Sequence, residues 1–165
     1  MKEIKIRRAV PEDLAELRQL YRDTVSNINS KDYDENQIRA WLQPWTEESF
    51  VAGERGGKFP DKILSQHFFV AIIDNVIAGF GSVDDTGYLD FMYVHKDYQR
   101  HGVAKRLLDE IENISREIGV KDLNSIVSKA ARGFFEKHGF NVIRQDTVEI
   151  RGATFVDNIM VKKLD

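Results

Sequence analysis

A short polar turn carries the residues best suited to binding an anion. Residues 99–104, Gln-Arg-His-Gly-Val-Ala, follow an apolar segment and precede an amphipathic one, which predicts a strand, a turn and a helix in succession. The first N–H groups of a helix have no partner within the helix, and they lie at the positive end of its dipole. Gly102 lets the backbone approach a ligand closely, and Arg100 and Lys105 add positive charge. The turn therefore favours phosphate binding, with an ordinary loop before a helix as the alternative.

Other patterns of catalytic or ligand-binding residues do not fit the sequence. The segment GERGGKF would need a glycine at Ala52 and a Ser or Thr at Phe59 to be a P-loop. The chain has no cysteine, which excludes thiol nucleophiles and cysteine-bound metals. Its four histidines form no helical pair around a glutamate, so we expect no metal. There is no Gly-x-Ser-x-Gly elbow, and the turn at Gly102 has one glycine where a dinucleotide fingerprint has three.

Length and composition narrow the class of protein. The chain of 165 residues fits one domain over 1–165, and 42% hydrophobic residues are enough for a core. A net charge of −3 offers no general attraction to nucleic acid or to an anionic membrane. The first residues alternate charged and apolar types, unlike a signal peptide, and no run is apolar enough to span a bilayer. We therefore expect a cytoplasmic protein without nucleic-acid or membrane partners.

Hydrophobic periodicity predicts the elements that position the turn. They are, in chain order, a strand near 4–9, a helix from 11, a helix over 35–42, three antiparallel strands over 68–94, a helix over 102–118, a strand over 122–127, a helix within 129–139 and two strands joined at 151–152. The strand over 122–127 can lie parallel to the strand before the long helix. One mixed sheet with helices packed on it is expected.

Two segments carry more specific expectations. The stripe of the helix over 102–118 should be buried and include Val103, Leu107, Leu108, Ile111, Ile114 and Ile118, with Glu112 largely outside it. In the second segment, Pro44 should stop the helix over 35–42. Residues 46–53 are compatible with a short helix, and residues 53–61 should be loop because glycines and a proline interrupt them.

The sequence resembles the GCN5-related N-acetyltransferase (GNAT) family. Residues 99–104 match its Gln/Arg-x-x-Gly-x-Gly/Ala signature, and ARGFFEKHGF resembles its second marker, Ala-x-x-Phe-Tyr-x-x-x-Gly-Phe. LDFMYVHKDYQ and IMVKKL look like the strands that precede the signature and close the fold, and the element order is similar. The resemblance covers nearly the whole chain and is weakest over 27–66. It implies an α+β GNAT-like single domain: a mostly antiparallel mixed sheet with one splayed parallel strand pair, and helices on both faces.

The resemblance also implies a reaction and a cosubstrate. An acetyl group would move from acetyl-CoA to a primary amine by direct attack in a ternary complex. Backbone groups of Met92, Tyr93 and Val94 would pair with the pantetheine arm, and the Val94 N–H would stabilise the developing oxyanion. The residues implied to hold the pyrophosphate through their amides are Gln99, Arg100, His101, Gly102, Val103, Ala104 and Lys105. The residues implied to line the rest of the cofactor are Ser128, Phe134, Phe135 and Lys137.

One position departs from the family pattern. The residue after Phe134 is commonly Tyr, which is proposed to protonate the departing sulfur, but here it is Phe135. Either the thiolate leaves without that help, or water or His138 serves. Acid catalysis of this kind contributes roughly 10²–10⁴-fold, so its loss need not abolish turnover.

The acceptor amine must lose a proton before it attacks. Asp90 is the candidate base, directly or through water, with a solvated or hydrogen-bonded strand carboxylate as an equal alternative. Tyr93 is the second candidate, with a core aromatic as the alternative. His95 and His101 are expected at the loop surface.

The acceptor site should be formed by the second predicted helix and the loop after it. Tyr33, Trp41 and Trp45 are candidates to wall it, although buried aromatics at helical spacing commonly belong to a core. Asp34 and Glu35 would attract a cationic amine or be solvated helix-start residues. The partner is then a small-molecule or peptide amine, and the chain a monomer or homodimer. A catalytically weak CoA-binding sensor is the alternative function, and a purely structural interaction domain is a third.

Overall fold

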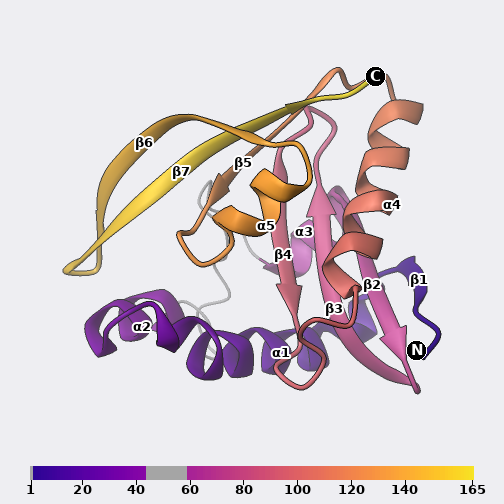
Figure 1. The fold of residues 1–165 in the computed structure, drawn as a ribbon. Helices are drawn as coiled ribbons and strands as arrows, with labels where there is room; N and C mark the ends of the chain where they lie inside the picture. The colour runs from indigo at the N-terminus through magenta and orange to yellow at the C-terminus, as the bar shows by residue number, and fades with distance from the viewer. Residues whose placement is uncertain (1, 44–58) are drawn as a thin grey trace.

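The computed structural model describes residues 2–43 and 59–165, and its strands form two sheets (Figure 1). The first sheet has the order β1-β2-β3-β4 and is antiparallel throughout. Its strands are β1 (Lys5–Arg8), β2 (His67–Ile73), β3 (Val76–Val83) and β4 (Leu89–Val94). The second sheet has the order β5-β7-β6 and is also antiparallel. Its strands are β5 (Asp122–Val127), β6 (Asn141–Ile150) and β7 (Ala153–Lys163).

Two tight turns form where the sequence predicts hairpins. Asp74 and Asn75 join β2 to β3 with φ angles of 51° and 63°, the left-handed conformation that such residues tolerate in a two-residue hairpin. Arg151 and Gly152 join β6 to β7 with φ angles of 49° and 82°. The predicted antiparallel meander and closing hairpin are confirmed.

Helices cover both faces of the first sheet, with α4 (Val103–Glu117) on one face and α1 (Leu14–Asn27) and α3 (Phe59–Ser65) on the other. Helices α2 (Glu35–Leu42) and α5 (Arg132–Lys137) contact the second sheet, and short 3₁₀ turns lie at Pro11–Asp13 and Asn29–Lys31. The loop predicted over 53–61 is wrong at its end, because Phe59, Pro60 and Asp61 begin α3. Proline is tolerated in the first turn of a helix, and Phe59 is fully buried. Pro44 and the segment 46–53 lie outside the described residues.

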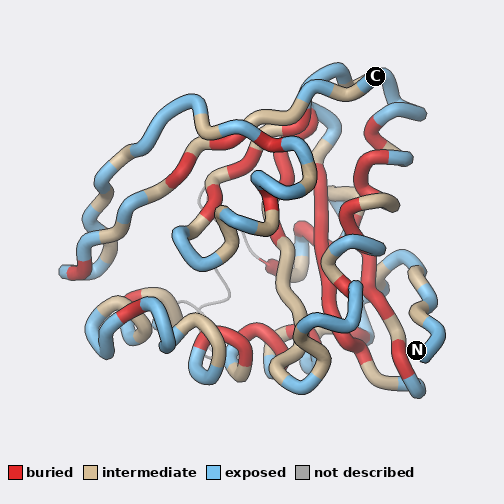
Figure 2. Tube along the Cα trace, viewed as in Figure 1, coloured by how far each residue is buried: buried red, intermediate tan, exposed pale blue. Residues whose placement is uncertain are grey.

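Each face of the first sheet has its own apolar core. Val103, Leu107 and Ile111 of α4 pack on one face, and Leu17 of α1 and Phe59 of α3 pack on the other. Figure 2 shows the buried residues concentrated on β2, β3 and the inner side of α4. Burial on both faces explains why β2 and β3 are nearly continuous apolar runs in the sequence.

The buried stripe of α4 differs from the prediction at two positions. Ile118 is 41% exposed, because α4 ends at Glu117 and Ile118 is its C-terminal capping residue. Glu112 is buried, because its carboxylate pairs with Lys162 Nζ at 3.0 Å and with Arg116. A charged group is stable at such a position only when it is paired.

The second sheet diverges from the first beyond one point of contact. A parallel bridge links Tyr88 to Asn124, and Ser125 Oγ donates to the Leu89 carbonyl at 2.8 Å. The expected single mixed sheet is therefore divided into two sheets, and the outer edge of β4 is not continued by β5 toward Val94. Within the described ranges, no helix is both long and apolar enough to cross a membrane.

Candidate active site

A cavity of about 1000 Å³ lies between β4, β5, α5, the start of α4 and the α1–α2 region. It brings together most of the residues that the sequence singles out. Those lining it are Tyr33, Trp41, Asp90, Met92, Tyr93, Val94, Gln99, Arg100, Gly102, Val103, Ala104, Lys105, Ser128, Phe134, Phe135 and Lys137. His101 is exposed and does not line it; its Nδ1 lies 2.8 Å from the Gln99 carbonyl. Trp45 lies outside the described residues.

Asp90 occupies a bulge in β4. Ser82 pairs with Phe91 and Val83 with Leu89, so Asp90 is an extra residue without a partner in the ladder. Bulges of this kind redirect side chains and are frequent beside active sites. The interruption re-aims the Asp90 carboxylate relative to a regular strand.

The Asp90 carboxylate belongs to a buried polar network. Its Oδ2 accepts hydrogen bonds from Lys62 Nζ at 2.8 Å and from Gln66 Nε2 at 2.9 Å. Its side chain is 2% exposed and that of Lys62 10%. Ser82 Oγ extends the network by donating to Gln66 Oε1 at 2.8 Å. Among the described residues, Asp90 Oδ1 has no hydrogen-bond partner, so one oxygen is engaged and the other is not.

The backbone amides of Met92 and Val94 point away from β3. Val94 lies opposite Gly79, and the next amide, that of His95, donates to the Ala78 carbonyl at 2.8 Å. Because antiparallel ladders alternate between pairs with and without mutual hydrogen bonds, Val94 and Gly79 form a pair without them. The amides of Val94 and Met92 therefore face the outer edge of β4, where the second sheet diverges.

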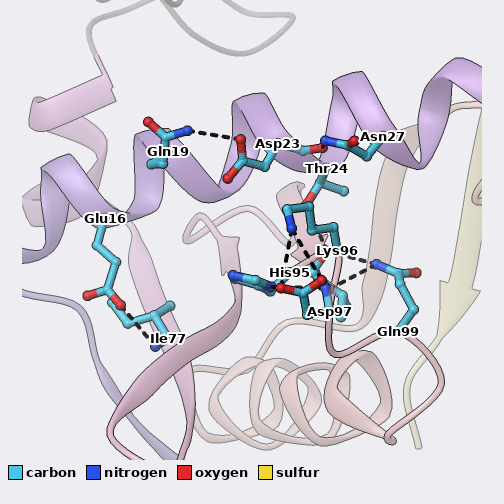
Figure 3. Close-up of polar contacts among 11 residues, drawn as sticks. Glu16, Gln19, Asp23, Thr24, Asn27, Ile77, His95, Lys96, Asp97 and Gln99 are labelled. Atoms are coloured by element: carbon cyan, nitrogen blue, oxygen red, sulfur yellow. Dashed lines mark hydrogen bonds and ion pairs between the residues drawn. The ribbon is translucent and has the colours of Figure 1, made fainter.

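Side chains fix the end of β4. Thr24 Oγ1 of α1 and Gln99 Nε2 of the following loop each donate to the Val94 carbonyl at 2.8 Å. Gln99 Nε2 also lies 3.4 Å from the His95 carbonyl. Figure 3 shows Thr24 on α1 and Gln99 on the loop after His95, with the Gln99 amide directed back toward the end of the strand. The signature glutamine thus ties the polar turn to the strand edge.

The turn before α4 exposes the first amides of the helix. Arg100 and Gly102 have φ angles of 61° and 81°, and Gly102 is the N-cap. Val103, Ala104 and Lys105 occupy the first turn, where backbone N–H groups have no acceptor within the helix. A Cβ on Gly102 would meet nothing within 4 Å, so the space beside these amides is open. We call the amides of Met92, Val94 and 103–105, which have no acceptor in the ladder or the helix and whose residues line the cavity, the amide end of the cavity.

Gly79 lets α4 begin close to the sheet. A Cβ at this position would lie 2.6 Å from Val103 Cγ1 and 2.9 Å from the Tyr93 carbonyl. Both distances are below any ordinary contact. The glycine in β3 is therefore what allows the first turn of α4 to lie directly over β3 and β4.

Positive charge gathers around the amide end. Arg100, Lys105 and Lys137 all line the cavity, and Lys105 is paired with Asp109 one turn later. Burial lowers the pKa of His138, and nearby Lys105 and Lys137 lower it further. His138 is consequently a neutral imidazole near pH 7, a poor proton donor to a leaving group.

Phe135 is a core residue as well as part of the cavity wall. It is 3% exposed and makes edge contacts with Phe134 and Phe140, at ring-centroid distances of 5.4 and 5.0 Å. The position where the family commonly has Tyr thus carries a packed aromatic ring without a hydroxyl.

Ser128, which directly follows β5, accepts hydrogen bonds from the Ala131 amide at its Oγ, 3.3 Å away, and at its carbonyl, 3.1 Å away.

Three aromatic rings form the wall on the other side of α5. Tyr33 and Trp41 pack edge to face with centroids 5.2 Å apart, and Phe155 of β7 lies 6.0 and 6.3 Å from them. Figure 1 places α2 and the β6–β7 turn on the opposite side of α5 from α4. The Tyr33 hydroxyl accepts from the Lys129 amide at 3.1 Å, and burial raises the pKa of this tyrosine, so the hydroxyl stays protonated.

Hydrogen bonds fix α2 beside β7. Gln37 Nε2 donates to the Thr154 carbonyl at 2.8 Å, and Arg151 Nη1 to the Ala40 carbonyl at 2.9 Å. Asp34 caps α2 by accepting from the Gln37 amide at 2.8 Å. Asp34 and Glu35 are exposed and absent from the cavity lining, so they are solvated helix-start residues.

Tyr93 projects into the packing between α1 and the first sheet. Its ring lies 4.6 Å from that of Tyr21 and 5.6 Å from that of Phe80, and it also lines the cavity. Its backbone pairs with Phe80 in the ladder. The core interpretation therefore accounts for most of its contacts.

Three residues of β7 that sequence reasoning missed line the cavity, namely Phe155, Val156 and Asp157. Burial raises the pKa of the Asp157 carboxyl, and Asp146 on the neighbouring strand raises it further. The period-two spacing of Phe155 and Asp157 indicates a shared face of β7, but the face that meets α2 is set by tertiary packing. We call Tyr33, Trp41, Phe155 and Asp157 the aromatic end of the cavity.

Known proteins resemble the whole chain. The model of the acetyltransferase (GNAT) domain matches residues 29–164. The uncharacterized N-acetyltransferase YafP of Escherichia coli K12 is 32% identical over 160 residues, which cover 97% of this chain and 96% of that protein. A GCN5-related N-acetyltransferase from Rhodopseudomonas palustris has a TM-score of 0.88 at 28% identity, with 99% and 98% of the two chains covered. The PaiA N-acetyltransferase of Thermoplasma acidophilum, solved with coenzyme A, shares the fold at 24% identity and a TM-score of 0.77 over 98% and 99%.

Proposed function

Because the chain belongs to the GNAT family of acetyltransferases, we propose that it moves an acetyl group from acetyl-CoA to a small-molecule or peptide amine by direct attack in a ternary complex. One observation carries the proposal. A single cavity joins the exposed amides of β4 to the exposed first turn of α4, beside an aromatic wall. A long anionic cosubstrate and an acceptor therefore have room side by side. The absence of any cysteine agrees with direct transfer without a cysteine acyl-enzyme.

The first turn of α4 suits the pyrophosphate of acetyl-CoA. The amides of Val103, Ala104 and Lys105 need acceptors, and phosphate oxygens at a helix N-terminus provide them. Gln99, Arg100, His101 and Gly102 complete the turn through their backbone, and Arg100 and Lys105 add charge. The open space at Gly102 leaves room for the phosphates.

The outer edge of β4 suits the pantetheine arm. Acetyl-CoA supplies an activated acyl group on a good leaving group. The Met92 and Val94 amides face the gap between the sheets and can donate to amide or thioester carbonyls, whereas the Tyr93 backbone faces β3. The Val94 N–H is the proposed donor to the developing oxyanion. Ser128, Phe134, Phe135 and Lys137 form the remaining wall.

Asp90 remains the proposed acceptor of the amine proton. Its Oδ1 is buried and has no hydrogen-bond partner among the described residues, and Asp90 lines the cavity, so no other donor competes with an amine or a bridging water that reaches this oxygen. Its Oδ2 is committed to Lys62 and Gln66, so the carboxylate is also structural. Tyr93 is the second proposed proton acceptor.

Phe135 offers no proton to the departing thiolate, and His138 is neutral. We propose that the thiolate leaves unaided or takes its proton from water. The same residues support the alternative function, a catalytically weak module that senses CoA. The two functions share the cofactor site and differ in turnover.

Thiol release from acetyl-CoA across a panel of primary amines separates the two functions. The transferase predicts release that depends on the amine. The sensor predicts that CoA raises the melting temperature, as ligand linkage requires, with no release from any amine. A melting temperature that saturating CoA does not change would contradict both.

A further inference from the structure

Asp157 is a half-buried carboxylate without a cation. It lines the cavity from β7, and within the described part of the chain no Lys, Arg or His forms an ion pair with it. The residue opposite it in the β6–β7 ladder is Asp146. Asp146 accepts two hydrogen bonds from the Arg144 guanidinium, at 2.9 and 3.1 Å. The Arg144 guanidinium therefore pairs with Asp146 and not with Asp157.

Within the described residues, two acids line the cavity, Asp90 and Asp157. Asp90 pairs with Lys62 at 2.8 Å. Asp157 is the one of the two that has no ion pair with a cation. Partly buried charged side chains that have no oppositely charged partner are frequent at functional sites, where a ligand can supply that partner.

The neighbours of Asp157 suit a cation that carries an apolar or aromatic body. Phe155 lies two residues earlier, on the same face of β7, and contacts Tyr33 and Trp41. The Tyr33 hydroxyl accepts from the Lys129 amide. Lys129, which does not line the cavity, also places its Nζ 4.6 Å from the centroid of the Tyr33 ring, so Trp41 and Phe155 are the rings without a cation of this kind among the described residues. Aromatic rings attract ammonium groups and pack against hydrocarbon.

Charge is divided across the cavity. Arg100, Lys105 and Lys137 line the amide end, whereas Asp157 lies with the aromatic rings. Arg151 also lines the cavity near the β6–β7 turn, but its guanidinium is bound to the Ala40 carbonyl. The distribution suits an anionic ligand at one end and a cationic ligand at the other.

We propose that Asp157 binds the ammonium group of the acceptor while Tyr33, Trp41 and Phe155 hold an apolar or aromatic body. The acceptor class is therefore an alkyl- or arylalkylammonium ion without a carboxylate beside the amine, since that carboxylate would lie against Asp157. This assignment rests on the proposed acetyl transfer and names its acceptor. Proton removal stays with Asp90.

The test compares 2-phenylethylamine with L-phenylalanine, which differ only in the α-carboxylate. Thiol release is measured at saturating acetyl-CoA for the wild type and for Asp157→Asn. We expect a KM for 2-phenylethylamine at least about tenfold below that for L-phenylalanine. Asp157→Asn should raise the KM for 2-phenylethylamine about tenfold or more, with kcat within about threefold, because ground-state binding is what is lost.

Asp146→Asn is the matched control, because it makes the same chemical change on the opposite strand and outside the cavity lining. It should leave the KM for 2-phenylethylamine unchanged. The KM for acetyl-CoA should be unchanged in both variants, and neither should melt below the wild type by more than a few degrees.

Three results would overturn the assignment: an unchanged KM in Asp157→Asn, a fall in kcat at constant KM, or a preference for L-phenylalanine. No release with 2-phenylethylamine would also overturn it. Release with other amines would then leave acetyl transfer intact, whereas no release with any amine would remove acetyl transfer as well.

Discussion

The two ends of the cavity are formed by different kinds of groups, backbone amides at one end and side chains at the other. The amide end consists of backbone N–H groups of β4 and α4, held in place by the glycines at 79 and 102 and by hydrogen bonds to the Val94 carbonyl. The aromatic end consists of side chains from α2, from the residue Tyr33 just before it and from β7, which meet only in the folded chain. In the proposed function, the backbone groups would bind acetyl-CoA, which is common to every reaction of the enzyme, and the side chains of the aromatic end would determine the acceptor. Asp90 lies between the ends and is shared with the core.

The largest effect is expected from breaking the buried pair of Asp90 and Lys62. Asp90→Asn leaves the Lys62 ammonium without its carboxylate, at 10% exposure of that side chain, and should lower the free energy of unfolding by about 3–5 kcal/mol. Denaturant titration measures this. Adding Lys62→Met to the variant should recover most of the stability.

Activity in that double variant then separates the two roles of Asp90. If the Asp90 carboxylate takes the proton of the amine, the double variant should fold but should not release thiol from acetyl-CoA with any amine. Wild-type stability in Asp90→Asn alone would contradict the buried pair, and normal turnover in the double variant would remove Asp90 as the base.

The next effect concerns the amide end. Gly102→Glu puts a carboxylate beside amides proposed to hold phosphate, and should weaken CoA binding by about 100-fold, or roughly 2.7 kcal/mol, through repulsion between like charges. Gly102→Gln carries the same strain at a φ of 81° and nearly the same volume, so it should lose much less affinity. Calorimetry with CoA measures both, and equal losses would show that the backbone, not the charge, matters.

Gly79→Ala should move the start of α4. The added methyl would lie 2.6 Å from Val103 Cγ1 and 2.9 Å from a backbone oxygen, which should cost about 1–3 kcal/mol of stability and weaken CoA binding several-fold. Gly81→Ala is the control, because its methyl would find the nearest atoms at 3.2 Å. Larger damage from Gly81→Ala would contradict the role given to Gly79.

The smallest effect is on stability at the aromatic end. Burial raises the pKa of Asp157, so the folded chain holds that proton more tightly than the unfolded chain, and stability falls as pH rises through the raised pKa. Asp157→Asn removes the penalty and should melt slightly higher than the wild type at pH 7. The gain should shrink as pH falls toward the ordinary value of 3.8, and a lower melting temperature at pH 7 would contradict it.

The amide end could be predicted from sequence because its signal is local. The glycine turn, the strand before it and the amphipathic helix after it occupy consecutive residues, and the structure places them together. The hairpin at Asp74 and Asn75 was predictable for the same reason. Ile118 was not, because the period of the stripe does not tell where the helix leaves the sheet.

The aromatic end could not be predicted in full because its residues are distant in sequence. Tyr33 and Trp41 were recognisable candidates, but their partner Phe155 comes from the last strand, and Asp157 gains significance only from the cation it lacks. The pairing of Asp90 with Lys62 was equally hidden, since α3 falls where glycines and a proline suggested loop. The Phe155 contacts, the position of Asp157 in the cavity and the Asp90–Lys62 pair all depend on packing between residues that are distant in sequence.

A crystal structure of the protein with CoA would show directly which groups hold the cosubstrate. We expect pyrophosphate oxygens within hydrogen-bond distance of the amides of 103–105, and the pantetheine arm along the outer edge of β4 beside Met92 and Val94. The aromatic end should stay open to an acceptor. CoA bound outside this cavity, or phosphates held by side chains while those amides stay solvated, would contradict this expectation.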